Sequence, residues 1–178
     1  MADGERIRLF CALRLPELAC STLVEWGSAQ LPGVRVVPRK NLHVTLCFLG
    51  SRDAGEVPEI ARELAAAATA AGQVRLRALH YRETRSVAMI VCEDIGGAGA
   101  RLAADLGARL ERLGVYRREP RPWLAHVTVA RFRERPRLDP PVPELGEVSP
   151  SDAAVYVSRL RPGGALYEPL EIAVLGGR

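Results

Sequence analysis

A tetrad of the form His-x-Thr-apolar occurs twice in this chain, as HVTL at residues 43–46 and as HVTV at residues 126–129. The chain has three histidines, so two of them open the same tetrad. Both tetrads have apolar, β-prone flanks, which predicts that each lies on a β-strand. Residues i and i+2 of a strand project from one face, so each histidine should share a face with its threonine while the apolar neighbours face a core. A fold that uses both tetrads has two such strands facing each other across a cleft.

The rest of the hydrophobic pattern predicts a mixture of strands and helices that do not strictly alternate. Runs of period two or of β-prone residues predict strands over 7–15, 34–37, 42–49, 74–81, 87–92, 126–131, 153–160 and 164–174. Apolar residues at helical spacing predict helices over 16–30, 57–70 and 98–113. This order favours an α+β fold with antiparallel sheets over a doubly wound one. The Pro-rich stretch 136–143 is predicted to be a connector.

Length and hydropathy indicate one globular unit. The 178 residues are typical of a single domain, so we expect one domain over residues 1–178. Mean hydropathy is near zero, and no apolar run approaches the length of a membrane-spanning helix. Met1 to Pro16 reads as a strand and not as a signal peptide. We therefore expect a soluble, cytoplasmic protein that is a monomer.

The four cysteines show no pairing pattern. They are scattered without a CxxC motif and have apolar neighbours, which predicts buried free thiols and disfavours a disulfide or zinc framework: Cys11, Cys20, Cys47 and Cys92.

Positive charge is concentrated in one segment. Residues 117–137 have a net charge of +5, whereas the whole chain has +4. Of the 25 basic residues only Lys40 is a lysine, which a high-GC genome or a need for bidentate phosphate binding by arginine would both explain. The basic segment is either a solvated loop or a surface for an anionic substrate.

Paired imidazoles and hydroxyls suit chemistry at a phosphate. A neutral histidine can accept a proton from a nucleophile, and a protonated one can donate a proton to a leaving oxygen. Threonine hydroxyls can donate hydrogen bonds to the non-bridging oxygens. In a single tetrad of this kind the histidine most often has a structural role. The repetition of the tetrad favours a functional role for both histidines. A two-histidine metal site is disfavoured, because no acidic residue or cysteine stands at ligand spacing near either tetrad.

The ordered set of motifs resembles the 2H phosphoesterase superfamily over essentially the whole chain. It is most similar to the bacterial and archaeal RNA 2′,3′-cyclic phosphodiesterases, historically called 2′-5′ RNA ligases. The resemblance rests on the two tetrads and on the matching segments RLF at 8–10, AL at 12–13, LP at 15–16, NL at 41–42, FLG at 48–50, AR at 130–131, VSRL at 157–160 and 164–170.

This resemblance implies two similar lobes, each an antiparallel sheet with outer helices, related by a pseudo-twofold around a central cleft. It implies hydrolysis of a terminal 2′,3′-cyclic phosphate of RNA to a 2′-phosphate, with the 3′ oxygen as leaving group and without a metal or nucleotide cofactor. His43 would be the general acid and His126 the general base on water. Thr45, Thr128 and Arg131 would hold the phosphate oxygens.

Two features of the second tetrad are the offset of Arg131 and the residue before His126. Arg131 lies five residues after His126, and an odd offset on a regular strand points to the opposite face. Arg131 can therefore reach a phosphate only if the strand ends or bulges near Ala130. Many members of the family have proline directly before this histidine, where this chain has Ala125; we expect the approach to the strand to differ and the mechanism to survive.

Other candidates are weaker. Alternation places His80 on a strand face with apolar residues, which favours a structural role. The aromatic residues near the tetrads could stack on a base, but core packing is favoured for each: Phe48, Trp123 and Phe132. The basic residues before the first tetrad could steer an RNA backbone or lie on a solvated loop: Arg35, Arg39 and Lys40.

The sequence leaves two other functions open. One is a noncatalytic module that binds RNA or nucleotides in the same cleft without reaction, which would bind with strong salt dependence. The other is RNA end joining, in which a ribose hydroxyl replaces water in the reverse direction of the same chemistry.

Overall fold

Strands and helices cover most of residues 5–176, which are the part of the chain that a computed structural model describes. In chain order the main elements are β1 (Arg6–Arg14), α1 (Glu17–Gln30), β2 (Arg35–Val36), β3 (His43–Asp53), α2 (Val57–Ala70), β4 (Leu76–Glu83), β5 (Val87–Asp94), α3 (Ala98–Arg112), β6 (His126–Arg131), β7 (Glu147–Val148), β8 (Asp152–Arg161) and β9 (Gly164–Val174). Short 3-10 turns precede β3, α2 and α3: η1 (Arg39–Asn41), η2 (Ala54–Glu56) and η3 (Ile95–Gly97). The predicted elements are present, and β7 is the strand that the sequence pattern did not indicate.

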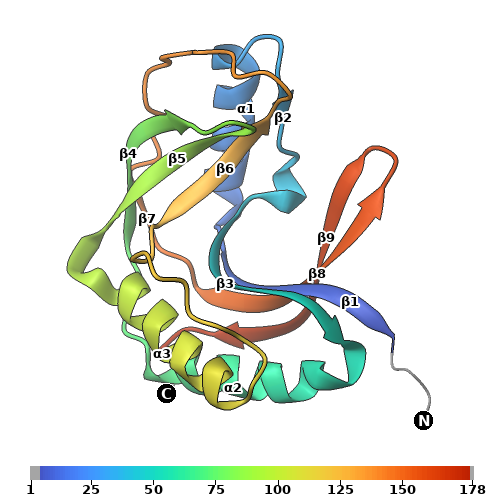
Figure 1. Cartoon of the computed structure of the whole chain (residues 1–178). Helices are drawn as coiled ribbons and strands as arrows, with labels where there is room; N and C mark the ends of the chain where they lie inside the picture. Colours follow the sequence, from blue (N-terminus) through green and yellow to red (C-terminus); the bar gives the residue numbers. More distant parts are fainter. Residues whose placement is uncertain (1–4, 177–178) are drawn as a thin grey trace.

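The strands form two antiparallel sheets, which confirms the predicted α+β fold. One sheet has the order β3-β1-β8-β9 and is called here the β1 sheet. The other has the order β2-β6-β5-β4-β7 and is called the β6 sheet. Each sheet contains one of the two tetrads, because the first lies on β3 and the second on β6. Figure 1 shows the two sheets at an angle to each other, with the β8–β9 hairpin projecting beyond the rest of the β1 sheet.

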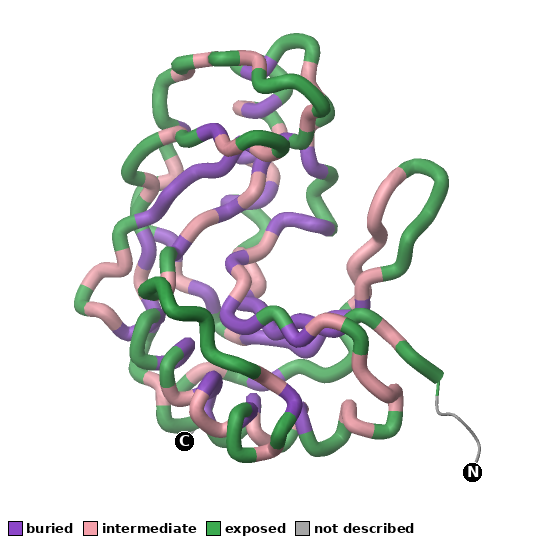
Figure 2. The backbone as a smooth tube through the Cα atoms, in the orientation of Figure 1, coloured by how far each residue is buried: buried purple, intermediate pink, exposed green. Residues whose placement is uncertain are grey.

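The main hydrophobic core joins both sheets to the helices. It contains apolar residues from β1, β3, β5 and β6 together with one face of each helix. In α2 this face is formed by Ile60, Leu64 and Ala68, at the i, i+4, i+8 spacing seen in the sequence. Figure 1 shows α2 and α3 packed below the β1 sheet, and Figure 2 shows that the interior stretches of the strands are buried. All four cysteines are buried and free, as predicted.

A β-bulge in β6 changes which face its last residue occupies. Ala88 of β5 pairs with Ala130, and Met89 pairs with Thr128, so Val129 is an extra residue on β6. Val129 and Ala130 are consequently both buried, although they are adjacent. The alternation then resumes with Arg131 on the same face as Thr128. Of the two alternatives that the odd offset of Arg131 left open, an end of the strand or a bulge near Ala130, the structure has the bulge.

A second bulge corrects the prediction for His80. Ala78 pairs with Cys92 and His80 pairs with Val91, which leaves Leu79 as an extra residue on β4. The bulge reverses the alternation, so His80 is exposed and does not share the buried face of Leu76.

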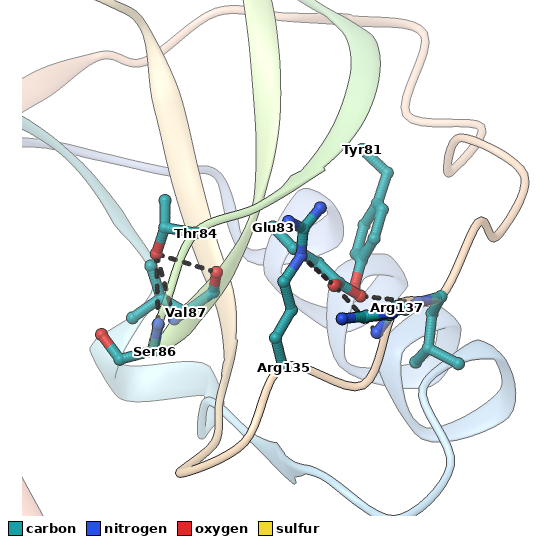
Figure 3. A network of polar contacts seen from close by, with 8 residues as sticks. Tyr81, Glu83, Thr84, Ser86, Val87, Arg135 and Arg137 are labelled. Carbon is teal, nitrogen blue, oxygen red and sulfur yellow. Dashed lines mark hydrogen bonds and ion pairs between the residues drawn. The ribbon is translucent and has the colours of Figure 1, made fainter.

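A buried carboxylate fixes the chain directly after β6. Glu83 accepts hydrogen bonds from the backbone N–H groups of Arg137 and Leu138, from Arg135 Nε and from the Tyr81 hydroxyl. Its side chain is 2% exposed. Figure 3 shows how these donors converge on Glu83. The connector after the second tetrad is thereby held against β4.

Candidate active site

Both tetrad histidines are held by the same local contact. His43 begins β3, and its Nδ1 lies 2.7 Å from the carbonyl oxygen of Asn41, two residues earlier. His126 begins β6, and its Nδ1 lies 2.9 Å from the carbonyl oxygen of Leu124, also two residues earlier. A carbonyl oxygen can only accept, so Nδ1 carries the proton in both rings. Nε2 of each ring is thereby left as the atom that can accept or donate a proton.

The first histidine already contacts the threonine of its own tetrad. His43 Nε2 lies 3.1 Å from Thr45 Oγ1. When His43 is neutral, Nε2 accepts from this hydroxyl, and when it is protonated Nε2 donates to it. Strand geometry explains the contact, because residues two apart project from one face.

Aromatic rings surround His43. Its ring centroid lies 4.9 Å from that of Phe10, 5.4 Å from that of Tyr167 in an edge-to-face arrangement, and 6.1 Å from that of Tyr156. These rings belong to a small apolar cluster on the β1 sheet. The rings shield His43 from water on one side.

This environment favours the neutral form of His43. Burial lowers the pKa of His43 to about 4, from a usual 6.5; the hydrogen bond to Asn41 opposes this, and the positive charges of His126 and Arg131 add to the lowering. β3 and β6, which carry the two tetrads, contact each other. In the unliganded site His43 is therefore neutral at neutral pH.

The candidate phosphate-binding residues line a single cavity of about 290 Å³. Thr45 enters from β3, and Thr128 and Arg131 enter from β6, on the face set by the bulge. Arg131 Nη2 donates a hydrogen bond of 3.3 Å to the Tyr167 hydroxyl on β9. His43 lines this cavity as well. His126 is partly exposed and starts the strand that carries Thr128 and Arg131, but it is not among the residues that line the cavity.

Sequence reasoning missed several residues of the site. Phe10, Tyr156 and Tyr167 contact His43, and the period-two pattern of their strands gave only a face and no partner. Asn41 is 7% exposed, and its Nδ2 donates to the Ala165 carbonyl at 2.8 Å while its Oδ1 accepts from the Tyr167 N–H at 3.3 Å. The available signals were its position two residues before His43 and its place in the matching segment NL at 41–42. Asn41 ties the β8–β9 hairpin to the histidine.

Some of the aromatic and basic candidates line the cavity, and others lie outside it. Phe48 lines the cavity and is 47% exposed, so the prediction that it packs in the core is wrong. Trp123 and Phe132 pack partly buried against the core as predicted, and Trp123 Nε1 donates to the Thr45 carbonyl. Arg35 lines the cavity, whereas Arg39 forms an ion pair with Glu17 on α1.

The basic segment 117–137 contributes less to the cavity than its charge suggested. Arg131 is its one arginine among the cavity-lining residues of the described chain. Three others form ion pairs with acidic residues: Arg118, Arg121 and Arg135. The other cavity arginines come from β1 and β2, so the positive charge of the cavity is assembled from three strands that are far apart in the sequence, of which β2 and β6 pair with each other.

Neither a metal cluster nor a membrane-spanning helix occurs in the described part of the chain. Within residues 5–176, no group of three or more histidine, cysteine, aspartate or glutamate side chains is clustered so that it could hold a metal ion. None of the helices in the same range is long and apolar enough to cross a membrane.

Comparison with known proteins gives consistent matches. A family model described as LigT like phosphoesterase matches residues 27–86. A Thermus thermophilus protein named RNA 2′,3′-cyclic phosphodiesterase is 33% identical over 182 residues, covering 96% of this chain and 91% of the relative. A Methanocaldococcus jannaschii protein of the same name is 22% identical over 176 residues, covering 93% and 99%.

Solved structures show the same fold. The crystal structure of the Thermus thermophilus protein TT0787 matches with a TM-score of 0.80 and 33% identity, covering 96% of this chain and 99% of that one. Escherichia coli LigT complexed with 3′-AMP matches with a TM-score of 0.82 and 22% identity, covering 97% and 100%.

Proposed function

Because the chain belongs to the LigT-like phosphoesterases of the 2H superfamily, we propose that it hydrolyses the 2′,3′-cyclic phosphate at the end of RNA, or of a nucleotide, to a 2′-phosphomonoester. The observation that carries the proposal is the pair of histidines. Each is anchored through Nδ1 to a carbonyl oxygen, which leaves Nε2 available, and His43 lines the same cavity as the two threonines and Arg131. Relatives named RNA 2′,3′-cyclic phosphodiesterase support the substrate class, and related structures are of complexes with nucleotides.

The proposed reaction needs one base and one acid. His126 Nε2 accepts a proton from water as the water oxygen bonds to phosphorus, and the bond from phosphorus to O3′ breaks. His43 Nε2–H donates its proton to O3′. Thr45, Thr128 and Arg131 donate hydrogen bonds to the non-bridging oxygens as negative charge grows on them. Each histidine is left in the opposite protonation state, and exchange with solvent restores both.

His43 must gain a proton before it can act as the acid. Burial and nearby positive charge lower its pKa to about 4. A bound phosphate places negative charge beside the ring and favours the imidazolium. Substrate binding and protonation of His43 are therefore coupled in this mechanism.

The test is a product assay with matched histidine variants. Purified protein in EDTA is expected to convert a nucleoside 2′,3′-cyclic phosphate to the 2′-monophosphate, resolved chromatographically from the 3′ isomer. His43→Ala and His126→Ala should each lower the rate at least about 10²-fold. His80→Ala is the control, because this histidine is exposed on β4 and outside the cavity.

Unchanged turnover in either tetrad variant would overturn the assignment. Tight, salt-dependent RNA binding without turnover would indicate the noncatalytic module instead. Joining of paired RNA ends in the same assay would indicate that a ribose hydroxyl can replace water.

A further inference from the structure

The cavity extends beyond the phosphate-binding residues along the β1 sheet. Phe10 contacts His43, and Arg8 lies two residues before Phe10 on the same strand. Both residues line the cavity. Because residues two apart on a strand are about 6.5–7 Å from each other on one face, Arg8 stands one step farther from His43 than Phe10 does.

Three cavity residues form one row across three strands. Arg8 of β1 pairs with Ser158 of β8, and Ser158 pairs with Tyr167 of β9. All three line the cavity. The row therefore presents a guanidinium and two hydroxyls on the cavity floor, next to the site of the histidines.

Arg8 has no acidic partner among the described residues. The ion pairs of residues 5–176 involve other arginines, including Arg159 on the neighbouring strand, which pairs with Glu168. The Arg8 guanidinium instead lies over the Phe48 ring, 5.2 Å from its centroid. A guanidinium held against a ring keeps its N–H edge free to donate, and this edge suits a phosphate.

Arg35, another arginine of the cavity, has a different contact. A side chain at Gly164, in the β8–β9 hairpin, would collide with the Arg35 guanidinium, so Arg35 packs directly on this turn. Arg35 thus links β2 to the hairpin. Arg8 is the cavity arginine that contacts neither the hairpin turn nor the Tyr167 hydroxyl.

We propose that Arg8 and Ser158 form a second anion subsite, which takes the phosphate on the 5′ side of the nucleotide that carries the cyclic phosphate. This inference rests on the proposed function and narrows its substrate class. The enzyme should prefer RNA ends, or nucleotides with a 5′-phosphate, to nucleosides whose one phosphate is the cyclic one. The 5′-phosphate can be a monoester or an internucleotide diester.

Three substrates distinguish a 5′-phosphate monoester from an internucleotide diester as the group that the subsite binds. They are adenosine 2′,3′-cyclic phosphate, the same compound with a 5′-phosphate, and a dinucleotide with a 5′-hydroxyl, an internal phosphodiester and a terminal cyclic phosphate. The wild-type enzyme should have a kcat/KM at least about tenfold higher for a substrate with the second phosphate, which corresponds to about 1.4 kcal/mol. A preference for both compounds indicates that either source fits, and a preference for one identifies it.

Arg8→Gln should remove this preference. Its kcat/KM on adenosine 2′,3′-cyclic phosphate should fall by less than on the two substrates with a second phosphate, because this compound lacks the group that Arg8 is proposed to bind. Arg159→Gln is the matched control, since it removes an arginine from the adjacent strand on the opposite face. The control should retain the preference, which separates a local contact from the general charge of the protein.

Equal losses on all three substrates in Arg8→Gln would overturn the subsite and assign Arg8 to the terminal nucleotide itself. A wild-type enzyme that turns over all three alike would also overturn the subsite. If no substrate is turned over, the proposed function fails, and calorimetry still tests the subsite. Adenosine 2′,5′-bisphosphate should then bind at least about tenfold more tightly than adenosine 2′-monophosphate, and equal affinities would refute the subsite.

Discussion

At the scale of single residues, the two histidines share a contact that sets which ring nitrogen is left free to exchange a proton. In each tetrad the carbonyl two residues before the histidine accepts from Nδ1. This contact needs only backbone geometry and does not depend on the side chain at position 125. The Ala125 carbonyl accepts from the Cys92 N–H and joins the approach to β5. The aromatic surroundings make His43 different from His126 in spite of the shared contact.

The protonation of His43 should depend on the ligand. Its pKa is about 4 in the unliganded protein because burial and nearby positive charge disfavour the imidazolium. Adenosine 2′-monophosphate should raise this pKa, since its phosphate attracts the positive ring. NMR titration of the imidazole resonances, with and without the nucleotide, measures the shift, and His80 serves as an internal reference outside the cavity. A His43 pKa that does not rise would contradict its role as the acid.

The same lowered pKa affects stability. A histidine whose folded pKa lies below its unfolded value stabilises the fold above the unfolded value, about 6.5. This contribution is lost as the pH falls from there toward about 4, because the unfolded chain binds the proton first.

At the scale of elements, the sequence pattern was sufficient to locate the strands and helices but not the bulges. The helix over 57–70 and the strand over 126–131 have the predicted ends, because apolar spacing and flanking turn residues are local signals. The bulges at Leu79 and Val129 depend on how two strands pair, which no local pattern records. A role for Arg131 at a phosphate led to the prediction that β6 either ends or bulges near Ala130, whereas His80 had no such role and its face was predicted wrongly.

In the candidate site too, local sequence signals were sufficient for some residues, and strand pairing determined the others. The sequence identified the histidines and threonines from the repeated tetrad. It could not identify Tyr167 or Arg8 as cavity residues, because these come from strands far from both tetrads and reach the cavity through sheet pairing.

The connector after β6 should depend on one carboxylate. Burial tends to raise the pKa of Glu83, but the hydrogen bonds from Leu138, Tyr81, Arg135 and Arg137 outweigh it and lower the pKa below its usual range. Glu83→Gln keeps the shape but loses the charge, and should lower the free energy of unfolding at pH 7 by about 2 kcal/mol. Urea denaturation measures this loss.

The pH dependence of that loss has a defined sign. The lowered pKa means that Glu83 stabilises the fold above the pKa of the unfolded carboxyl, and that this contribution disappears as the pH falls through the folded value. The wild type and Glu83→Gln should therefore converge in stability in acid. Glu119→Gln is the control, because its ion pair with Arg121 is exposed, and it should change stability by at most about 1 kcal/mol. A constant difference between Glu83→Gln and wild type across pH would contradict this account.

At the scale of the whole molecule, positive charge is arranged in two different ways. The basic segment 117–137 has a net charge of +5, but several of its arginines are engaged in ion pairs away from the cavity. The cavity instead has Arg8, Arg35 and Arg131, from β1, β2 and β6, and none of them has an acidic partner among the described residues. Local unpaired charge, and not the total, is what a phosphate would meet.

This arrangement predicts a sharp difference between two arginines of the same segment. Arg131→Gln should lower kcat/KM for a cyclic phosphate by about 10²–10³, the effect of removing one donor to a developing oxyanion. Arg133→Gln removes the same charge two residues away, at an exposed position outside the cavity, and should change kcat/KM by less than about threefold. Assays at about 50 and about 300 mM salt separate the two effects, because a general field is screened and a direct contact much less so. Similar losses in both variants, both weakened by salt, would mean that the segment acts through its total charge after all, whereas a salt-resistant loss confined to Arg131 places its guanidinium at the reacting phosphate.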